Sequence, residues 1–238
     1  RFTTVLIAAV SVSVLAACTA TVGGTAVRGA FALPVEQILP TVAEVSDAVG
    51  STLDPGGFPV RGGIDVLPNG IRDDSTASPI DCLGAAMPFM RVVYEKGDVR
   101  EAAWQDFSRF GAGQTVSSVD AGVIGFASDA EAQRMFAAFA ARWRACEGTT
   151  VTTHARDADL YATITEGRVQ GPILSATILT GDNRDGSRFP TEHALGVAEG
   201  RIVDVDLAVT GSSPADRLAA GRAVKLAEAM LEKVSRGG

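Results

Sequence analysis

Hydrophobic residues along the chain follow two different periods, and the change between them marks its central unit. Val116 to Phe126 reads Val-Ser-Ser-Val-Asp-Ala-Gly-Val-Ile-Gly-Phe, a short apolar run typical of a buried strand. Ser128 and Glu131 then form a capping-box pattern, and Gly148 is a stop signal. Between them, apolar residues recur at helical spacing: Ala132, Met135, Phe136, Phe139, Trp143 and Cys146. The pattern predicts a strand that leads into a helix packed on its own sheet.

Helical and strand patterns also precede the central unit. Helical spacing runs from Pro34 to Gly50, with a kink expected at Pro40. Residues 81–94 indicate a short helix or two turns, and residues 99–110 a strand. The Pro- and Gly-rich stretch 51–79 is long for a connection without structure of its own, which is typical of a functional flap or a mobile segment. We favour the mobile segment.

After the central helix the pattern is mainly that of strands. Turn signals, including Glu166-Gly167, separate five candidates: 149–153, 159–165, 171–180, 191–199 and 201–209. A last helix runs to about Val234, with Ser212, Ser213 or Asp216 as its expected cap. This order predicts an α+β fold, an antiparallel sheet with helices packed on one face.

Charge excludes two classes of partner. The 238 residues include 21 basic and 28 acidic side chains, a net charge of −7. No basic stripe is present to displace the counterions of nucleic acid, so we expect no nucleic-acid partner. Electrostatic binding to anionic lipid is excluded for the same reason. Any membrane attachment must therefore be covalent or through a spanning helix.

The N-terminus predicts a lipid anchor. Residues 1–17 combine a basic start with a short apolar run, as a secretory signal does, and Leu15-Ala16-Ala17-Cys18 matches a bacterial lipobox. Cys18 would then carry the lipid, residues 18–33 would form a flexible tether, and 34–238 the domain, on the outer face of the cell membrane. The alternatives are an ordinary signal with a chance cysteine, or an uncleaved anchor.

The two remaining cysteines favour a disulfide. Cys82 and Cys146 form an even pair in an exported chain, and their bond would close a loop of about 65 residues, worth about 4 kcal/mol on the loop-entropy model. Two free buried thiols are the alternative. A catalytic thiol is disfavoured, because neither cysteine has a histidine nearby in the sequence.

Several segments together resemble a known family. They are Asp81-Cys82-Leu-Gly-Ala with Pro88 and Tyr94, Val119 to Phe126, Ala130-Glu-Ala-Gln133, and Trp143-Arg-Ala-Cys146. Over about residues 35–236 the chain resembles the extracellular sensor domain of the mycobacterial Ser/Thr kinase PknH, which actinobacterial lipoproteins also carry. The resemblance implies an antiparallel sheet with helices, a cleft for an unidentified ligand, and a bond between Cys82 and Cys146. The family's second disulfide has no counterpart, since Val203-Asp-Val-Asp206-Leu stands where the family often has a cysteine.

Other chemistry receives little support. The kinase, serine-hydrolase and zinc-protease motifs are absent from the sequence, and Gly181 to Glu192 suits a hairpin turn better than a calcium loop. His154 and His193 are interpreted as surface or strand-end residues. Asp204 and Asp206 are interpreted as ordinary patterning of a half-buried strand. We therefore predict no catalytic residue, no metal and no cofactor.

The sequence predicts a lipid-anchored extracytoplasmic protein that binds an unknown small-molecule or envelope ligand and is not an enzyme. The alternatives are an envelope scaffold, a lipid carrier, or an enzyme with a dispersed site. Candidate ligand-binding residues are Trp104, Tyr161 and Arg168, where stretch 51–79 would overhang the sheet. The alternatives for them are core packing for Trp104 and surface exposure for the other two.

Overall fold

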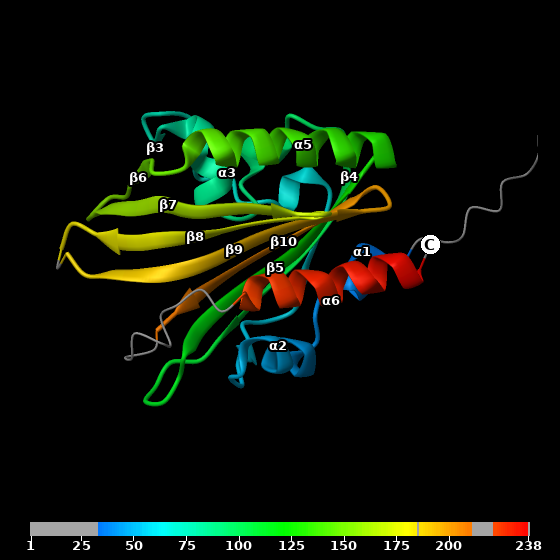
Figure 1. Ribbon diagram of the computed structural model, residues 1–238, viewed down its shortest axis with the longest axis horizontal. Coiled ribbons are helices and arrows are strands. Elements are labelled where there is room, and N and C mark those ends of the chain that lie inside the picture. Colours follow the sequence, from blue (N-terminus) through cyan, green and yellow to red (C-terminus); the bar gives the residue numbers. More distant parts are fainter. Residues whose placement is uncertain (1–32, 185, 211–220, 238) are drawn as a thin grey trace, which may run out of the picture.

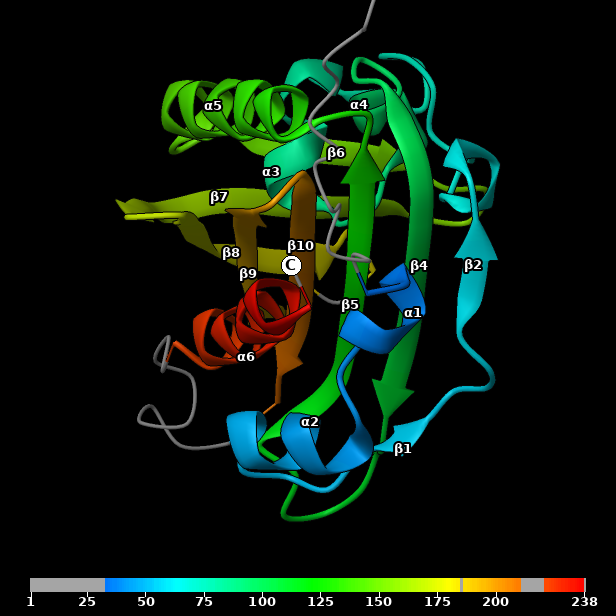
Figure 2. The same ribbon diagram turned by 90° about the vertical axis from the view of Figure 1, so that its right-hand side faces the viewer.

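The computed structural model describes residues 33–184, 186–210 and 221–237. Its described strands form one ten-stranded antiparallel sheet in the order β1-β4-β5-β10-β9-β8-β7-β6-β3, with β2 also paired to β4 (Figures 1 and 2). The α+β prediction with an antiparallel sheet is confirmed. The long strands are β4 Val99–Ser108, β5 Val116–Phe126, β6 Thr150–His154, β7 Asp159–Gln170, β8 Ile173–Asp182, β9 Arg188–Ala198 and β10 Arg201–Val209.

The central strand and helix are as predicted. β5 leads directly into α5, Asp129–Cys146, whose apolar stripe packs on the sheet. The Ser128 hydroxyl accepts the Glu131 amide, as a cap should. The reciprocal half of the capping box is not formed, because the Glu131 carboxylate instead binds Asp98 and Arg134.

The turn predicted at Glu166-Gly167 is a β-bulge. β7 runs on to Gln170, and its register with β8 shifts between Thr165 and Arg168. Glu166 has φ of +52°, so the extra residue is absorbed in a left-handed conformation without ending the strand. The chain reverses later, at Gly171 and Pro172.

Helices cover both faces of the sheet, not one as predicted. Along β10, Ile202 belongs to one core cluster and its neighbour Val203 to the other, because successive strand residues point to opposite faces. Figure 1 shows α3 (Leu83–Ala86) and α5 on one side and α6 on the other. The sequence Val203-Asp-Val-Asp-Leu has the pattern of a strand with one solvent-facing side, although Asp204 is buried and Asp206 is only partly exposed.

The second face is covered from both ends of the chain. α1 (Val35–Ile38) and α2 (Val42–Val49) are separated at Pro40, with Thr41 capping and Gly50 ending α2, so the kinked helix is confirmed. Both pack with α6, Arg222–Arg236, over β4, β5, β9 and β10. α6 begins at Arg222 with Gly221 as its N-cap, and not at the predicted caps Ser212, Ser213 or Asp216, which lie in 211–220, outside the described residues.

Stretch 51–79 is ordered along the sheet and is not the mobile segment we favoured. Its backbone pairs with sheet edges through β1 (Asp54–Pro55), β2 (Val60–Gly62) and β3 (Ala77–Ser78), with a short 3-10 helix η1, Ile64–Val66. Gly56 donates its amide to the Asp106 carbonyl, and a Cβ there would lie 1.8 Å from the Asp106 carboxylate. Gly56 therefore leaves room for the Asp106 side chain where the two strands pair.

Candidate functional site

A buried polar cluster joins the sheet to the helical segment above it. The segment comprises η2 (Ile80–Cys82), α3 and α4 (Arg91–Tyr94). The Asp204 carboxylate on β10 accepts hydrogen bonds from the Tyr94 hydroxyl (2.7 Å) and the Phe89 amide (3.2 Å), and its other oxygen lies 2.8 Å from His193 Nε2. His193 Nδ1 lies 3.1 Å from the Ala85 carbonyl oxygen. The side chains of Tyr94, His193 and Asp204 are almost fully buried. The cluster therefore anchors α3 and α4 to the sheet.

The hydrogen bonds determine where the protons are. A carbonyl only accepts, so His193 Nδ1 must donate to Ala85, and Nε2 then shares a second proton with Asp204. Burial by itself would lower the pKa of His193, but the charge and hydrogen bond of Asp204 outweigh it and the pKa is raised. His193 is therefore not the surface histidine expected from the sequence, whereas the exposed His154 pairs with Asp159 at a strand end as expected.

Phe89, whose amide donates to Asp204, has an unusual backbone conformation. Its φ is +57°, which is unusual for a bulky residue and is tolerated only where surrounding contacts demand it. Its ring lies on Gly122 of β5, where a Cβ would approach the ring to 2.6 Å. Gly122 thus leaves room for the ring while Asp204 binds the amide.

Next to this cluster, a row of charged side chains crosses four strands. In the strand register Asp106 is opposite Asp120, Asp120 is opposite Asp206, and Asp206 is opposite His193. Directly opposed residues have Cβ atoms about 5 Å apart, at which like charges repel. Asp206 Oδ1 is buried and has no hydrogen-bond partner within the described residues. The interpretation of Asp204 and Asp206 as ordinary strand patterning is therefore wrong.

Burial and neighbouring carboxylates raise the pKa values of two aspartates in this row. They raise the pKa of Asp120 to about 6, through burial and then Asp106 and Asp204. They raise the pKa of Asp206 to about 8, where burial is the main cause and His193 partly offsets it. Both acids are thus stabilised in their protonated form by folding.

The row predicts that the domain loses stability as the pH rises. For each raised acid, the stabilising contribution is complete below the unfolded pKa of 3.8 and is lost as the pH passes the folded value, about 6 for Asp120 and about 8 for Asp206. His193 acts in the same direction, because its raised pKa favours folding below the unfolded value of 6.5. We therefore expect the urea concentration at the unfolding midpoint to decrease as the pH rises from about 4 to about 8.

Asp206→Asn should flatten this pH dependence. For full burial the rise in pKa from 3.8 to about 8 corresponds to an upper limit of about 6 kcal/mol at high pH, which the residual solvent contact of Asp206 reduces. Asp157→Asn is the matched control, because Asp157 is exposed. Equal pH profiles for wild type and Asp206→Asn would contradict the assignment.

A groove lies on the outer side of the same helical segment, between α5 and η2, α3 and α4. We call it the helix groove. It has a volume of about 190 Å³. Its apolar floor consists of Ile80, Val93, Met135, Phe139 and Trp143. Its polar rim consists of Asp81, Lys96, Arg134 and Arg142.

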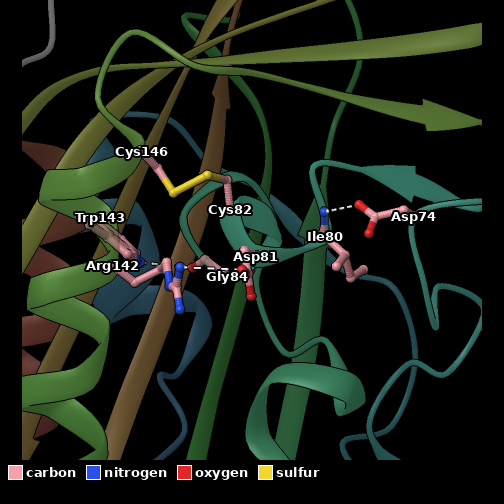
Figure 3. Close-up of a disulfide and its surroundings, with 8 residues drawn as sticks. All are labelled: Asp74, Ile80, Asp81, Cys82, Gly84, Arg142, Trp143 and Cys146. Carbon is pink, nitrogen blue, oxygen red and sulfur yellow. Dashed lines mark hydrogen bonds and ion pairs between the residues drawn. A yellow bond between two sulfur atoms is a disulfide. The ribbon is translucent and has the colours of Figure 1, made fainter.

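The walls of the helix groove are fixed to one another. The predicted Cys82–Cys146 disulfide is present and joins η2 to the end of α5 (Figure 3). The Trp143 indole donates to the Gly84 carbonyl at 3.0 Å, and Arg142 pairs with Asp81 at 3.4 Å (Figure 3). The two walls of the groove are therefore joined by a covalent bond and a partly buried hydrogen bond.

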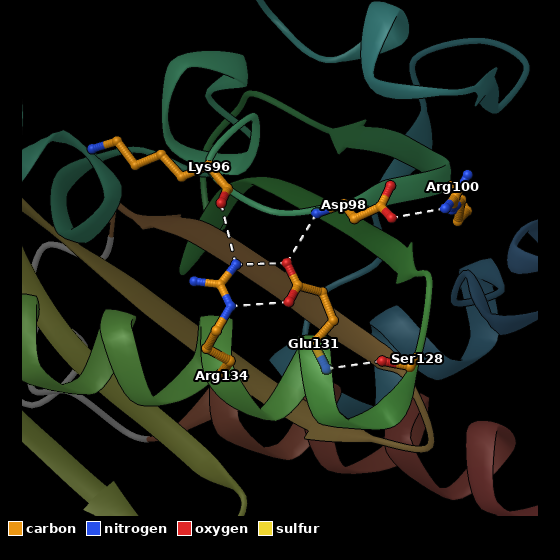
Figure 4. A network of polar contacts seen from close by, with 6 residues as sticks. All are labelled: Lys96, Asp98, Arg100, Ser128, Glu131 and Arg134. Atoms are coloured by element: carbon orange, nitrogen blue, oxygen red, sulfur yellow. Dashed lines mark hydrogen bonds and ion pairs between the residues drawn. The ribbon is translucent and has the colours of Figure 1, made fainter.

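The other end of the rim is ordered by Glu131. Its carboxylate binds the Arg134 guanidinium and accepts the Asp98 amide, and Arg134 also donates to the Lys96 carbonyl (Figure 4). The hydrogen bond from Arg134, followed by that from Asp98, lowers the pKa of Glu131 to about 2. Glu131 thus stays ionised and holds the 96–98 turn against α5.

The structure does not bring the three predicted ligand-binding residues together. Trp104 lies on β4, where its indole donates to the Val66 carbonyl at 3.1 Å and its ring stacks on Phe89. Trp104 therefore has a packing role, and stretch 51–79 does lie against it. Tyr161 and Arg168 lie on β7, separated from β4 by four intervening strands in the sheet order.

Arg168 borders a different hollow. It pairs with Glu166 at 3.6 Å and, with Glu192 and Gly221, lines a cavity of about 150 Å³. The helix groove was missed from sequence because its lining residues come from three segments whose apolar positions read as core.

Two further features bear on function. None of the helices in the described part of the chain is long and apolar enough to span a bilayer. No three His, Cys, Asp or Glu side chains in that part are grouped so as to hold a metal ion. Cys18, the predicted lipid attachment site, lies outside the described residues.

A family model described as the PknH-like extracellular domain matches residues 32–233. The chain belongs to the PknH-like extracellular domain family. Its fold is similar to the crystal structure of the extracellular domain of PknH from Mycobacterium tuberculosis, with a TM-score of 0.70 and 21% identity. That match covers 85% of this chain and 95% of the PknH chain, and at this identity it shows the fold.

Other similarities are weaker. A putative uncharacterized protein from Mycobacterium smegmatis matches with a TM-score of 0.41 and 12% identity, over 82% of this chain and 96% of that one. No curated protein is significantly similar to the chain. The family places this PknH-like domain outside the cytoplasm, and it is a sensor-type family that is generally not catalytic.

Proposed function

We propose that this PknH-like domain is a non-catalytic sensor module, held on the outer face of the cell membrane by a lipid on Cys18, that binds a ligand in the helix groove. The observation that carries the proposal is the groove itself. A concave apolar floor bordered by a few polar side chains is the usual form of a small-molecule site.

The fixed walls support binding. The disulfide, the Trp143–Gly84 hydrogen bond and the Glu131 network hold both sides of the groove in place before any ligand arrives. A preorganised site loses little conformational entropy when it binds. The polar cluster under α3 gives the floor a rigid base.

The test is hydrogen exchange of the chain from residue 18 onward, with and without cell-envelope extract. We expect protection in α4 and α5. Ala138→Trp should abolish it, since Ala138 is exposed and lines the groove. Ala137→Trp, at an exposed position that does not line it, is the matched control and should leave protection unchanged.

Other outcomes would redirect the proposal. Protection confined to β4 or β7 would place the ligand near Trp104 or Tyr161 and overturn the groove assignment. An acyl chain that co-purifies and is seen by native mass spectrometry would favour a lipid carrier. No protection by any extract would favour an envelope scaffold.

The proposed organisation is a signal at 1–17, a lipidated Cys18 with a tether to residue 33, and a domain from 34 to 238. The family match beginning at residue 32 supports this division. Because the net charge of −7 disfavours electrostatic attachment, the lipid is the proposed link to the membrane.

Cys18→Ser is expected to release the protein from the membrane fraction or to leave the signal uncleaved. The reason is that a serine hydroxyl cannot carry the thioether-linked lipid. Fractionation followed by intact-mass measurement tests both results. Ser13→Ala, inside the apolar run, serves as a control and should leave processing unchanged. Normal processing together with unchanged membrane partition in Cys18→Ser would refute the anchor.

A further inference from the structure

Positive charge is concentrated on the rim of the helix groove. Lys96, Arg134 and Arg142 line it, with Asp81 as the acidic lining residue. This is notable in a chain whose net charge is −7. Surface charges more than about 8 Å apart are largely screened at physiological salt, so a ligand in the groove responds to the rim more than to the whole protein.

The three cations are engaged to different degrees. Arg134 is bound by Glu131, and Arg142 by Asp81 at 3.4 Å with both side chains at least half exposed. Lys96 is exposed, and its ammonium has no partner among the described residues. In Figure 4 its side chain extends away from the Glu131–Arg134 pair. Lys96 is thus the cation that is free to pair with a ligand.

The floor restricts the size of the ligand's apolar part. Val93 and Phe139 approach so closely that a Cβ on Gly84 would lie 2.9 Å from one and 3.2 Å from the other. The groove volume of about 190 Å³ is below the roughly 300 Å³ at which pockets for drug-sized ligands begin. A short aliphatic or single aromatic body fits this space, whereas a full-length acyl chain does not.

We infer that the helix groove binds a small anionic amphiphile, with its short apolar body against the partly exposed Ile80, Val93 and Ala138 and its carboxylate or phosphate at Lys96. The inference rests on the proposed function and names its ligand class. A cationic amphiphile of the same shape would place like charge beside Lys96 and Arg142. A neutral one would lose the ion pair.

The probes are hexanoate, hexyl phosphate and hexylammonium, which share a six-carbon body and differ in the charged group. Each is titrated into the chain from residue 18 onward, with Cys18→Ser, and followed by backbone amide NMR shifts. We expect both anions to shift groove signals and to bind about tenfold more tightly than hexylammonium. The tighter of the two anions identifies the preferred headgroup.

Lys96→Gln should weaken the binding of hexanoate about two- to fivefold, as expected for loss of one exposed ion pair. Arg144→Gln is the matched control: it removes one positive charge from α5, at an exposed position outside the groove. It should leave the affinity unchanged. Both variants alter exposed side chains, so unchanged urea midpoints are expected.

Equal binding of hexanoate and hexylammonium, or equal effects of Lys96→Gln and Arg144→Gln, would overturn the inference. The exchange experiment with envelope extract distinguishes a wrong ligand class from a wrong binding function. If extract protects α4 and α5 but hexanoate shifts no groove signal, the ligand class is wrong and the binding function stands. If neither produces an effect, both fail.

Discussion

Replacing Asp204 by alanine is expected to destabilise the domain by about 3–5 kcal/mol, the range for leaving a buried charge without its partner. The substitution removes the acceptor of three donors: the His193 imidazole, the Tyr94 hydroxyl and the Phe89 amide. Phe89 would also lose a contact that holds its left-handed backbone. Urea denaturation at pH 6 measures the loss.

Asp206→Ala is a stringent control for this prediction. It lies two residues away on the same strand and the same face, yet its Oδ1 lacks a partner in the described structure and its pKa is raised. Removing it should leave stability unchanged or increase it at pH 8. Two aspartates of one strand are thus expected to act in opposite directions, and equal losses in both variants would show that the cluster is not the anchor.

Tyr94→Phe separates the contribution of one hydrogen bond. The tyrosine is fully buried, and burial together with Asp204 raises its pKa well above the ordinary value. Loss of this single hydrogen bond should lower the free energy of unfolding of the domain by about 1–3 kcal/mol. Combined with Asp204→Ala, the losses should be less than additive because both variants break the same contact.

The second large effect is expected from the disulfide. Cys82→Ala with Cys146→Ala should lower the free energy of unfolding by about 4 kcal/mol, because the bond closes a loop with a sequence separation of 64. It should also weaken hexanoate binding, since the bond ties η2 to α5 across the helix groove. Unfolding in urea and the NMR titration measure these two effects.

Wild-type protein with reductant is the control and should match the double variant. Alkylation of the unfolded, unreduced chain should label neither Cys82 nor Cys146. Two labelled thiols in protein recovered from the extracytoplasmic fraction would contradict a native bond. An unchanged urea midpoint in the double variant would show that packing, including Trp143 against Gly84, holds α5 by itself.

The periodicity of the sequence correctly predicted the central strand and helix. Val116–Phe126 and the helix ending at Cys146 carry strong local periodicity, and both were found within a residue of their observed bounds. The Cys82–Cys146 pair followed from counting, and the family from motifs at 81–146. These features are local or depend on few alternatives.

The predictions from sequence were wrong where segments that are distant in the chain meet in the structure. Glu166-Gly167 has the composition of a turn, yet pairing of β7 with β8 on both sides keeps the strand intact. Stretch 51–79 has the composition of a mobile loop, yet open backbone groups on β4 and β6 bind parts of it. His193 and Asp204 looked like strand-surface residues until α3 and α4 covered them.

The sequence by itself determined the strand and helix periods, the cysteine pair, the charge and the family, because each depends on residue identity and spacing within the chain. Only the tertiary structure decided which polar residues are partnered and which surface is hollow. Asp204 and Asp206 have the same local pattern, but one meets three donors and the other meets like charge. The helix groove likewise exists only where η2, α4 and α5 come together, since its floor residues otherwise have the signature of core.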